Sequence, residues 1–442
     1  MTLLFWLSIA VVAYVYAGYP SLLRAWALLR AWYCRLQIAD CRLNADWRIG
    51  NEANPNDPNP NDPNLNDPNP NDPNPNLQSA ICNLQCPGVS IVIAARDEGP
   101  RLAARIENLL GLDYPADRRQ IVVVSDGSTD NTLDVLARYD GVVDAVSVPP
   151  GGKALALNAG VAQARFDVIV FADARQVFAS DAVKELVAPL NDPAVGAVTG
   201  ELLLDAESPC RRIADRRGGH TGPLMHAGAD PRVGPSGDRR TGIDRRRTVR
   251  STIADGVGLY WKYEKQIRRL ESAIDSTLGA TGAIYAMRRS LFRPLPPDTV
   301  LDDVLTPMRV VLAGFRVVFN ERARAFDRAA IDADAEARRK VRTLAGNYQI
   351  LALEPRLLLP WHNRVWLQYV SHKIGRLVVP YAMLTMFCAS VVLAADHLFY
   401  ALVLGGQVGL FLLAGCGALI EYRGRIADGK FAALPVPAQR VA

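Results

Sequence analysis

Hydrophobic runs that end in a carboxylate recur along this chain, and they constrain its fold more than any other feature. VSIVIAA is followed by Asp97, IVVV by Asp126 and VIVFA by Asp173, and a further acidic site, Asp302-Asp303, follows PPDTVL. β-Branched runs that alternate with helical patterns predict a parallel sheet covered by helices. Parallel strands place their carboxyl ends at one edge, where ligands bind, so we expect these acids to gather there.

The strand and helix patterns divide the central part of the chain into two halves. In the first half, residues 88–205, strands are expected at 89–95, 120–125, 142–148 and 167–172, with helices at 101–112, from Thr129 and at 153–164. In the second half, residues 251–352, we expect a long helix at 253–274, a glycine-rich turn at 279–287, the strand FRVVF and an arginine-rich helix at 334–352. The sequence therefore predicts an α/β fold with a doubly wound, mostly parallel sheet.

Three apolar segments predict transmembrane helices. Hydrophobic residues make up 50% of the chain, and the segments lie at 1–23 and, as a hairpin over 377–419, at 377–395 and 398–419. Arginine and lysine follow the first segment, precede the second and follow the third. By the positive-inside rule the amino terminus lies outside, and residues 24–376 and the tail, 420–442, are cytoplasmic. These patterns predict a multi-pass protein of the cell membrane with a cytoplasmic central domain.

The segment just before the hairpin, residues 361–376, is expected to be amphipathic. Trp361, Trp366 and Tyr369 in this segment are residue types that favour the membrane–water interface. We therefore expect this segment to lie at the membrane surface.

Two further segments have an unusual composition and contain no candidate catalytic residues. Residues 54–76, within a linker at 24–87, repeat Asn-Pro-Asn-Asp-Pro, which favours an extended, solvated spacer. Residues 206–250 are rich in glycine, arginine and aspartate. The interspersed acids favour a disordered basic insertion, and the alternative is a basic arm for anionic lipids or a polyanionic acceptor.

Charge and cysteine spacing argue against two classes of function. The formal net charge of +5 is modest and concentrated in arginine clusters, so it does not indicate a nucleic-acid-binding protein. The seven cysteines form no metal-spaced set, which favours free thiols in a reducing compartment.

The ordered motifs over about 88–345, apart from the insertion, resemble those of family 2 glycosyltransferases. The resemblance is to the membrane-integrated branch that includes cellulose, chitin and hyaluronan synthases. It is carried by VSIVIAARDE with Arg96, Asp97 and Glu98, by VVVSDGSTDNT, by GGKALALN, by FADARQ and by LDDVLTP. The resemblance implies a glycosyltransferase A-type domain that binds a nucleotide sugar, most simply a UDP-sugar, and an acceptor that is a lipid-linked sugar or glycan.

The resemblance assigns the donor to the first half of the domain. Arg96, Asp97 and Glu98 end the opening strand, and Asp126 is placed at the uridine, where a carboxylate can accept the N3–H of uracil. Ser128 or Asp130 would cap the next helix, and Lys153 would bring its charge to an anion at a helix N-terminus.

A divalent ion, Mg²⁺ or Mn²⁺, is implied at Asp173, because the family carries Asp-x-Asp there. In this chain Arg175 replaces the second aspartate. Either Asp173 holds the ion together with phosphate oxygens and water, or Arg175 supplies part of the positive charge through a bidentate phosphate contact.

The acceptor side rests on the acidic pair. Asp303 is the expected general base and Asp302 the alternative, and both are expected in a loop beside a strand. The family's Gln-x-x-Arg-Trp signature binds the diphosphate and stacks on the acceptor, and it reads RKVRT at 339–343 in this chain. The resemblance therefore implies that Arg342 helps to bind the donor diphosphate, while the glutamine and tryptophan are absent.

The sequence therefore predicts a membrane-bound, inverting glycosyltransferase. The first alternative is a processive polysaccharide synthase, whose channel would need a synthase or export partner protein. The second is a catalytically inactive relative that binds a nucleotide or glycan within an export complex, because Arg175 and Thr343 depart from the family motifs.

Overall fold

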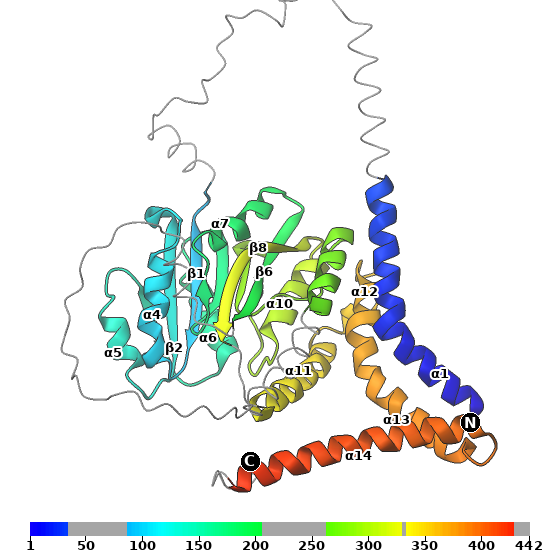
Figure 1. The fold of residues 1–442 in the computed structure, drawn as a ribbon. Coiled ribbons are helices and arrows are strands. Elements are labelled where there is room, and N and C mark those ends of the chain that lie inside the picture. Colours follow the sequence, from blue (N-terminus) through cyan, green and yellow to red (C-terminus); the bar gives the residue numbers. More distant parts are fainter. Residues whose placement is uncertain (34–85, 206–261, 329–332, 428–442) are drawn as a thin grey trace, which may run out of the picture. The chain divides into compact units, whose positions relative to one another are not determined.

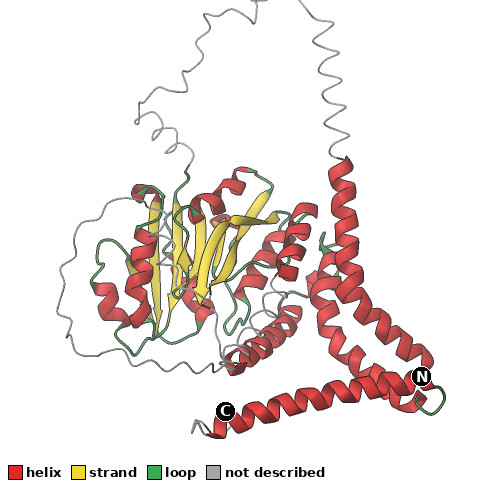
Figure 2. Cartoon of the chain, viewed as in Figure 1, coloured by secondary structure: helices red, strands yellow, loops and turns green. Residues whose placement is uncertain are grey.

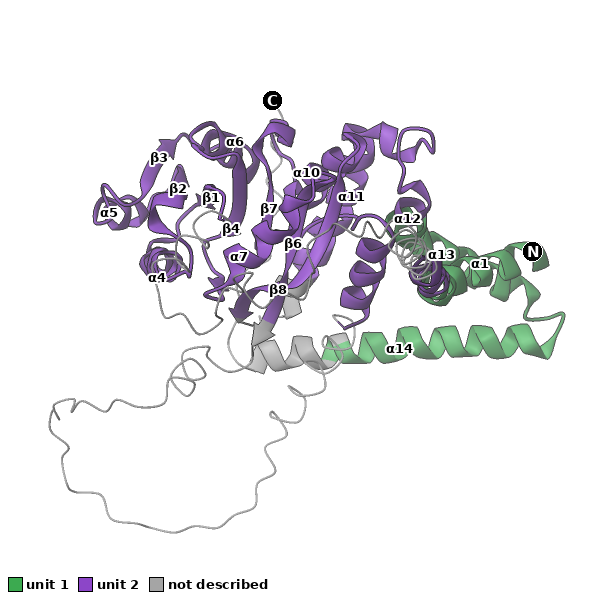
Figure 3. Ribbon diagram, turned by 90° about the horizontal axis from the view of Figure 1, so that it is seen from above, with its two compact units in different colours: residues 1–21, 371–442 green, residues 22–370 purple. Residues whose placement is uncertain are grey.

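The computed structural model describes residues 1–33, 86–205, 262–328 and 333–427. The linker repeat at 54–76 and the insertion at 206–250 lie outside the described residues. The chain divides into two compact units, residues 1–21 with 371–442 and residues 22–370, which are described separately (Figure 3).

The described part of the larger unit is built on one eight-stranded sheet (Figures 1 and 2). Its strand order is β3-β2-β1-β4-β7-β6-β8-β5. The strands are β1 (Val89–Ala95), β2 (Arg119–Asp126), β3 (Asp144–Val148), β4 (Val168–Asp173), β5 (Val177–Phe178), β6 (Val195–Asp205), β7 (Ile284–Arg288) and β8 (Arg316–Arg328). The first four pair in parallel, whereas β7 runs antiparallel between β4 and β6.

The predicted α/β class and its mostly parallel first half are confirmed. The helices of this unit are α4 (Gly99–Leu110), α5 (Thr132–Ala137), α6 (Lys153–Ala162), α7 (Ala182–Val187), a helix over 262–274, α10 (Asp302–Leu312), α11 (Ala333–Leu353) and α12 (Trp366–Tyr369). The sequence patterns located the first four strands and α6 to within a few residues. They did not reveal that β7 reverses direction, because a buried run reads the same in either direction.

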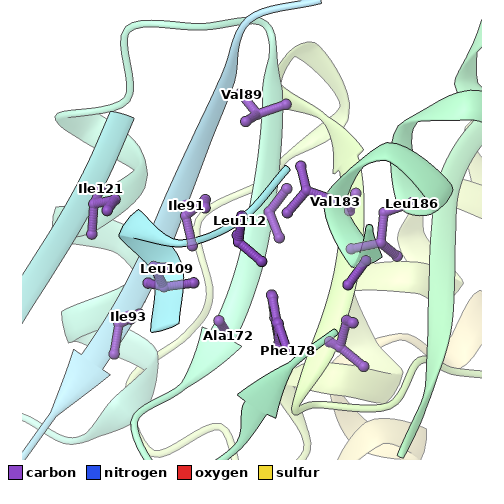
Figure 4. Packing of buried hydrophobic residues seen from close by; sticks show 14 of the residues in the cluster. Val89, Ile91, Ile93, Leu109, Leu112, Ile121, Ala172, Phe178, Val183 and Leu186 are labelled. Atoms are coloured by element: carbon purple, nitrogen blue, oxygen red, sulfur yellow. The ribbon is translucent and has the colours of Figure 1, made fainter. Parts of the chain in front are cut away.

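The core explains why these strands lie where they do. Val89, Ile91 and Ile93 alternate along β1 and pack with Leu109 of α4 in one cluster, shown in Figure 4. On the other face of β1, the Val92 side chain lies against α6, where a Cβ at Gly160 would come within 2.4 Å of it. The central strand is therefore buried on both faces, as a doubly wound sheet requires.

The register brings the strand ends to one level. Ala95 of β1 is paired with Ser125 of β2, and Ala94 is paired with Asp173 of β4. The order reverses at β1, since β2 lies on one side and β4 on the other. Such a switch point leaves an open crevice at the carboxyl ends of the strands, and this is where the acids of the first half are placed.

The smaller unit is helical. Among the residues that the structure describes, three helices are long and apolar enough to cross a membrane: Thr2–Tyr33, Trp366–Leu393 and Leu398–Gly417, the last within α14 (Leu398–Ala427). α1 (Thr2–Ala13) packs on α13 (Gly375–Leu393), with Phe5 buried beside Ala389 and Leu393. The second span begins earlier than the sequence indicated, at Trp366, so it includes much of the segment expected at the interface.

Candidate active site

Carboxylates form hydrogen bonds between the turns that follow β1 and β2. Asp97 has a positive φ of 53°, and its Oδ1 accepts hydrogen bonds from the amide and hydroxyl of Thr129, at 2.8 and 3.2 Å. Asp130 Oδ2 accepts from the amide of Gly99 at 3.0 Å, while Oδ1 accepts from the amide of Thr132, also at 3.0 Å. The hydrogen bond from the Thr132 hydroxyl holds the pKa of Asp130 below its ordinary value. Asp97 and Asp130 thus fix the geometry of these turns.

Glu98 and Arg96 flank that junction. Glu98 pairs with Arg101 one helical turn later, at 3.3 Å, and its amide donates to the Thr132 hydroxyl. Arg96 is exposed, and its Nη1 lies 3.8 Å from Asp126 Oδ2. Of the three residues expected at the end of the first strand, Arg96 is therefore the one that points toward the predicted uridine residue.

Asp126 is buried and holds the glycine turn that begins α6. Its Oδ1 accepts from the amide of Gly151 at 2.7 Å, and its Oδ2 accepts from the amide of Gly152 at 3.0 Å. Gly152 has a φ of 87°, a conformation that favours glycine. The next residue, Lys153, is the first of α6. Asp126 therefore positions Lys153 through the backbone, a role that the sequence did not indicate.

Lys153 connects the two halves of the domain. Its Nζ lies 3.2 Å from Asp173 Oδ1 at the end of β4 and 3.3 Å from Asp302 Oδ2 at the start of α10. Asp302 is almost fully buried. The ammonium thus joins a carboxylate from each half, as sequence order alone could not show.

The Lys153 side chain keeps its positive charge at neutral pH. Burial by itself lowers the pKa of the ammonium, but the carboxylates of Asp302, Asp173 and Asp303 raise it, and the net shift is upward. The site therefore carries a permanent positive charge at neutral pH, close to three acids.

The acidic pair lies in a different element from the one expected. Asp302 and Asp303 form the first turn of α10, not a loop beside a strand, so that expectation is corrected. Carboxylates are favourable there because the N-terminus of a helix carries unpaired amides and partial positive charge. The apolar residues of VLTPMRVVL recur at helical spacing and could have located the helix, although Pro307 lies inside it.

Asp303 has the more open position of the two. It is partly exposed, whereas Asp302 is buried. The glycine-rich turn makes room for it: a Cβ at Gly282 would lie 3.0 Å from Asp303 Oδ2. The backbone of this turn also donates to Asp303, from the amide of Ala280 to its carbonyl oxygen at 2.7 Å. Asp303 therefore remains the better candidate for contact with an acceptor.

Two of the expected cations lie outside the Lys153 cluster. Arg175 is exposed, and within the described residues no hydrogen bond or ion pair of its guanidinium is found. Arg342 of α11 donates from Nη2 to the carbonyl of Val300 at 3.2 Å. Val300 lies two residues before the acidic pair, so Arg342 holds the approach to the site through the backbone.

Arg105 and Asn108 of α4 are residues that the sequence analysis missed. The Arg105 side chain is buried, its guanidinium carbon lies 4.1 Å above the Phe178 ring, and its Nη1 donates to Asn108 at 2.7 Å. Asn108 in turn pairs with the amide and the carbonyl of Phe178. Burial lowers the pKa of Arg105 to about 9, and Asp173 opposes that shift. A charged residue on the apolar stripe of α4 was the available signal.

A buried phenol lies near the acids. Tyr285 of β7 stacks on Phe171 of β4 with ring centroids 4.6 Å apart. Burial raises the pKa of Tyr285 well above its ordinary value, and Asp302 and Asp303 raise it further. The phenol therefore stays neutral.

The residues present fit a divalent ion only with help from a ligand. No group of three or more histidine, cysteine, aspartate or glutamate side chains that could hold a metal is found among the described residues. Asp173 can offer carboxylate oxygen, and Mg²⁺ is commonly bound by one or two carboxylates together with substrate phosphates and water. The donor set thus fits an ion brought with a diphosphate and does not form a closed protein cage.

Comparison with known proteins identifies the family of the first half of this domain. Residues 90–208 match the family described as Glycosyl transferase family 2. The chain contains a family 2 glycosyltransferase domain. The sequence resemblance is thereby confirmed for the half of the domain that carries Asp126, Lys153 and Asp173.

Individual relatives match the same region. The probable glycosyltransferase YdaM of Bacillus subtilis is 37% identical over 125 residues, which are 26% of this chain and 30% of that protein. The poly-β-1,6-N-acetyl-D-glucosamine synthase of Staphylococcus aureus is 32% identical over 117 residues, 26% of this chain and 28% of the synthase. The matched segment thus spans less than a third of either relative.

A solved structure extends the likeness of the fold. The mannosyltransferase PcManGT from Pyrobaculum calidifontis, in complex with GDP-Man and Mn²⁺, aligns over 92% of both chains with a TM-score of 0.54 and 19% identity. At this identity the alignment shows the fold, a glycosyltransferase A-type domain with helical segments, and does not assign a substrate.

Proposed function

We propose that this chain is a membrane-anchored, inverting glycosyltransferase that transfers a sugar from a nucleotide sugar to a lipid-linked or glycan acceptor. The observation that carries the proposal is the Lys153 ammonium, 3.2 Å from Asp173 and 3.3 Å from Asp302. This cation lies where the donor half meets the acceptor half. A departing diphosphate would need positive charge at that place.

In the proposed reaction the chain's own residues divide the work. Asp303 accepts the proton of the acceptor hydroxyl as that oxygen attacks the anomeric carbon from the face opposite the nucleotide. Lys153, held by Asp302, keeps positive charge beside the departing diphosphate. Arg175 is exposed near Asp173 in sequence and is available for a phosphate. A divalent ion bound with Asp173 would supply further neutralisation of the leaving group.

The proposal is tested with the purified full chain in lipid nanodiscs. Radiolabelled UDP-sugars, with GDP-mannose as a further donor, are incubated with lipid-linked and oligosaccharide acceptors. Transfer from one donor with inversion supports the proposal. Absence of transfer and of hydrolysis from every donor, with nucleotide still bound, supports the inactive scaffold instead.

A processive polysaccharide synthase is the second candidate. It is favoured by one observation, the 32% identity to the poly-β-1,6-N-acetyl-D-glucosamine synthase. The length of the product in the same assay separates the two candidates, because a processive enzyme extends one acceptor many times before releasing it. An export or synthase partner protein belongs to this second candidate.

Substitution Asp126→Ala is expected to weaken UDP binding by roughly 1–3 kcal/mol, because it removes a buried acceptor. The loss has two sources: the contact proposed for the uracil N3–H, and the hydrogen bonds to Gly151 and Gly152 that position Lys153. Calorimetric titration of UDP measures it. Asp140→Ala, at an exposed acid of the same domain, is the control and should leave affinity unchanged. Unaltered affinity in Asp126→Ala would contradict the donor-site assignment.

Metal removal is expected to abolish turnover, and Asp173→Ala is expected to abolish Mn²⁺ binding in the presence of UDP. Electron paramagnetic resonance of Mn²⁺ reads binding without relying on activity. Arg175→Ala, two residues away, should keep the Mn²⁺ signal while weakening the binding of the nucleotide. Full activity in a chelator would instead assign the neutralisation to Lys153 and Arg175 alone.

Topology forms part of the proposal. Reporter fusions are expected to place the amino terminus and the loop at Asp396-His397 outside, and residues 24–376 and the carboxyl terminus inside. The reason is the position of lysine and arginine around the three apolar segments. A cytoplasmic reporter signal from the loop would refute this orientation.

A further inference from the structure

Arg105 is a buried cation that the proposed reaction does not use. It shares one face of α4 with Leu102, Ile106 and Leu109 of the apolar cluster, and only 2% of the residue is exposed. Its Nε and Nη2 are buried without a hydrogen-bond partner, and within the described residues no ion pair of its guanidinium is found. The charge is therefore held in an apolar environment with only part of its hydrogen bonding satisfied.

Packing alone does not explain a charge at this position. Burial lowers the pKa of Arg105 to about 9, because an apolar environment disfavours the charged form. A methionine would cover the Phe178 ring without this cost, and replacement of a buried ion by an apolar residue is often neutral or stabilising. The guanidinium nevertheless remains charged at neutral pH, so the charge itself needs a role.

Asp173 is the carboxylate that offsets the cost of burying Arg105. Its attraction raises the pKa of the guanidinium, in opposition to burial. A short segment relates the two residues: Ala172 and Ala174, on either side of Asp173, belong to the same buried cluster as Phe178, whose ring the guanidinium covers (Figure 4). Arg105 is therefore close enough to act on an anion bound at the end of β4.

Asn108 fixes the position of this charge. Its Oδ1 accepts hydrogen bonds from Arg105 Nη1 at 2.7 Å and from the amide of Phe178 at 2.8 Å, and its Nδ2 donates to the carbonyl of Phe178 at 3.0 Å. Phe178 in turn pairs with Ala325 of β8. The guanidinium is thus placed by the backbone that follows Asp173.

We propose that Arg105 is an electrostatic residue of the donor site, whose buried charge favours the donor diphosphate through the apolar interior without touching it. The inference rests on the proposed function, since the diphosphate is that of the proposed nucleotide sugar. A charge in a protein interior acts on its neighbours more strongly than the same charge in water. Arg175, which stands where the family carries an aspartate, changes the charge of the same segment in the same direction.

The experiment uses the full chain in nanodiscs, with a chelator present so that no divalent ion contributes charge. Ligand-observed nuclear magnetic resonance measures the affinities of UDP and of uridine, which lacks the diphosphate. Arg105→Met removes the charge and keeps an apolar side chain, whereas Arg105→Lys keeps a charge.

Arg119→Met is the matched control. Burial also lowers the pKa of Arg119, but this residue begins β2, at the opposite end of the strand from Asp126. Its guanidinium donates to the carbonyls of Leu110 and Leu112, so its role is to hold the end of α4. Arg119→Met should therefore leave the ratio of the UDP and uridine affinities unchanged.

Arg105→Met is expected to weaken UDP binding by roughly threefold or more and to leave uridine binding unchanged, because only the diphosphate responds to the lost charge. Arg105→Lys should keep most of the UDP affinity. Denaturant unfolding should show that Arg105→Met is at least as stable as the wild type, since the variant no longer buries a charge.

Equal weakening of UDP and uridine binding, or no weakening of either, would overturn the inference, because Arg105 would then have a packing role alone. The inference also fails if Arg105→Lys binds UDP as weakly as Arg105→Met. If the wild type binds UDP only after Mg²⁺ is added, the ion supplies the charge and the inference is wrong. If the wild type binds no UDP under either condition, the donor site itself is refuted, and with it the proposed function.

Discussion

Substitution Asp303→Asn is expected to lower the turnover of sugar transfer by about 10² or more while nucleotide binding persists. Asparagine keeps the size and the hydrogen-bonding capacity of the side chain but cannot accept the proton of the acceptor hydroxyl. Asp303 is the partly exposed member of the acidic pair and has the Gly282 turn beside it. Steady-state transfer and UDP titration on the same preparation measure the two quantities.

Asp302→Asn is the matched comparison, because it removes one charge from the adjacent position. Asp302 is buried and its Oδ2 lies 3.3 Å from Lys153 Nζ. Loss of the Asp302 charge should therefore disturb the Lys153 ammonium and weaken donor binding as well as turnover. If Asp302→Asn eliminates turnover while Asp303→Asn stays fully active, the base is Asp302. If neither change matters and the wild type transfers no sugar, the protein is an inactive scaffold.

The sequence was informative about the first half of the domain because each of its strands can be recognised from a short stretch of sequence. Each β-branched run between 89 and 173 is bounded by turn residues, so period and composition locate it without knowledge of its neighbours. The acids at the ends of those runs then share one edge by the geometry of parallel pairing alone. Asp126 and Asp173 could therefore be placed from sequence.

Contacts between distant segments were not accessible in the same way. Lys153 and Asp302 are far apart in sequence, and nothing in either segment indicates that they meet at 3.3 Å. The sequence predicted that Asp126 binds the uracil base, but its carboxylate already accepts hydrogen bonds from two glycine amides. That role depends on the path of the backbone after β3, which side-chain patterns do not report.

Arg309→Ala is expected to destabilise the protein by roughly 1–3 kcal/mol, because it removes the more buried of the two arginines that pair with the Glu354 carboxylate and leaves only the exposed Arg356. Arg309 of α10 lies 2.8 Å from Glu354, with side-chain exposures of 11% and 8%, and it also donates to the carbonyl of Pro294. Glu354 lies between α11 and the short helix η5 (Pro355–Leu358), so this pair joins the helix of the acidic pair to the element before the candidate span. Denaturant unfolding of the full chain in micelles measures the change.

An exposed pair of equal length provides the control. Arg165 and Asp144 are also 2.8 Å apart, but their side chains are 67% and 44% exposed, so Arg165→Ala should cost at most about 1 kcal/mol. The pH dependence separates the two further. Burial raises the pKa of Glu354, but hydrogen bonds from Arg356 and Arg309 outweigh it, and the net shift is downward. The stability that Glu354 contributes is therefore complete above the ordinary glutamate pKa and is lost as pH falls through the lower folded value. Equal losses in Arg309→Ala and Arg165→Ala at neutral pH would show that burial does not strengthen the pair.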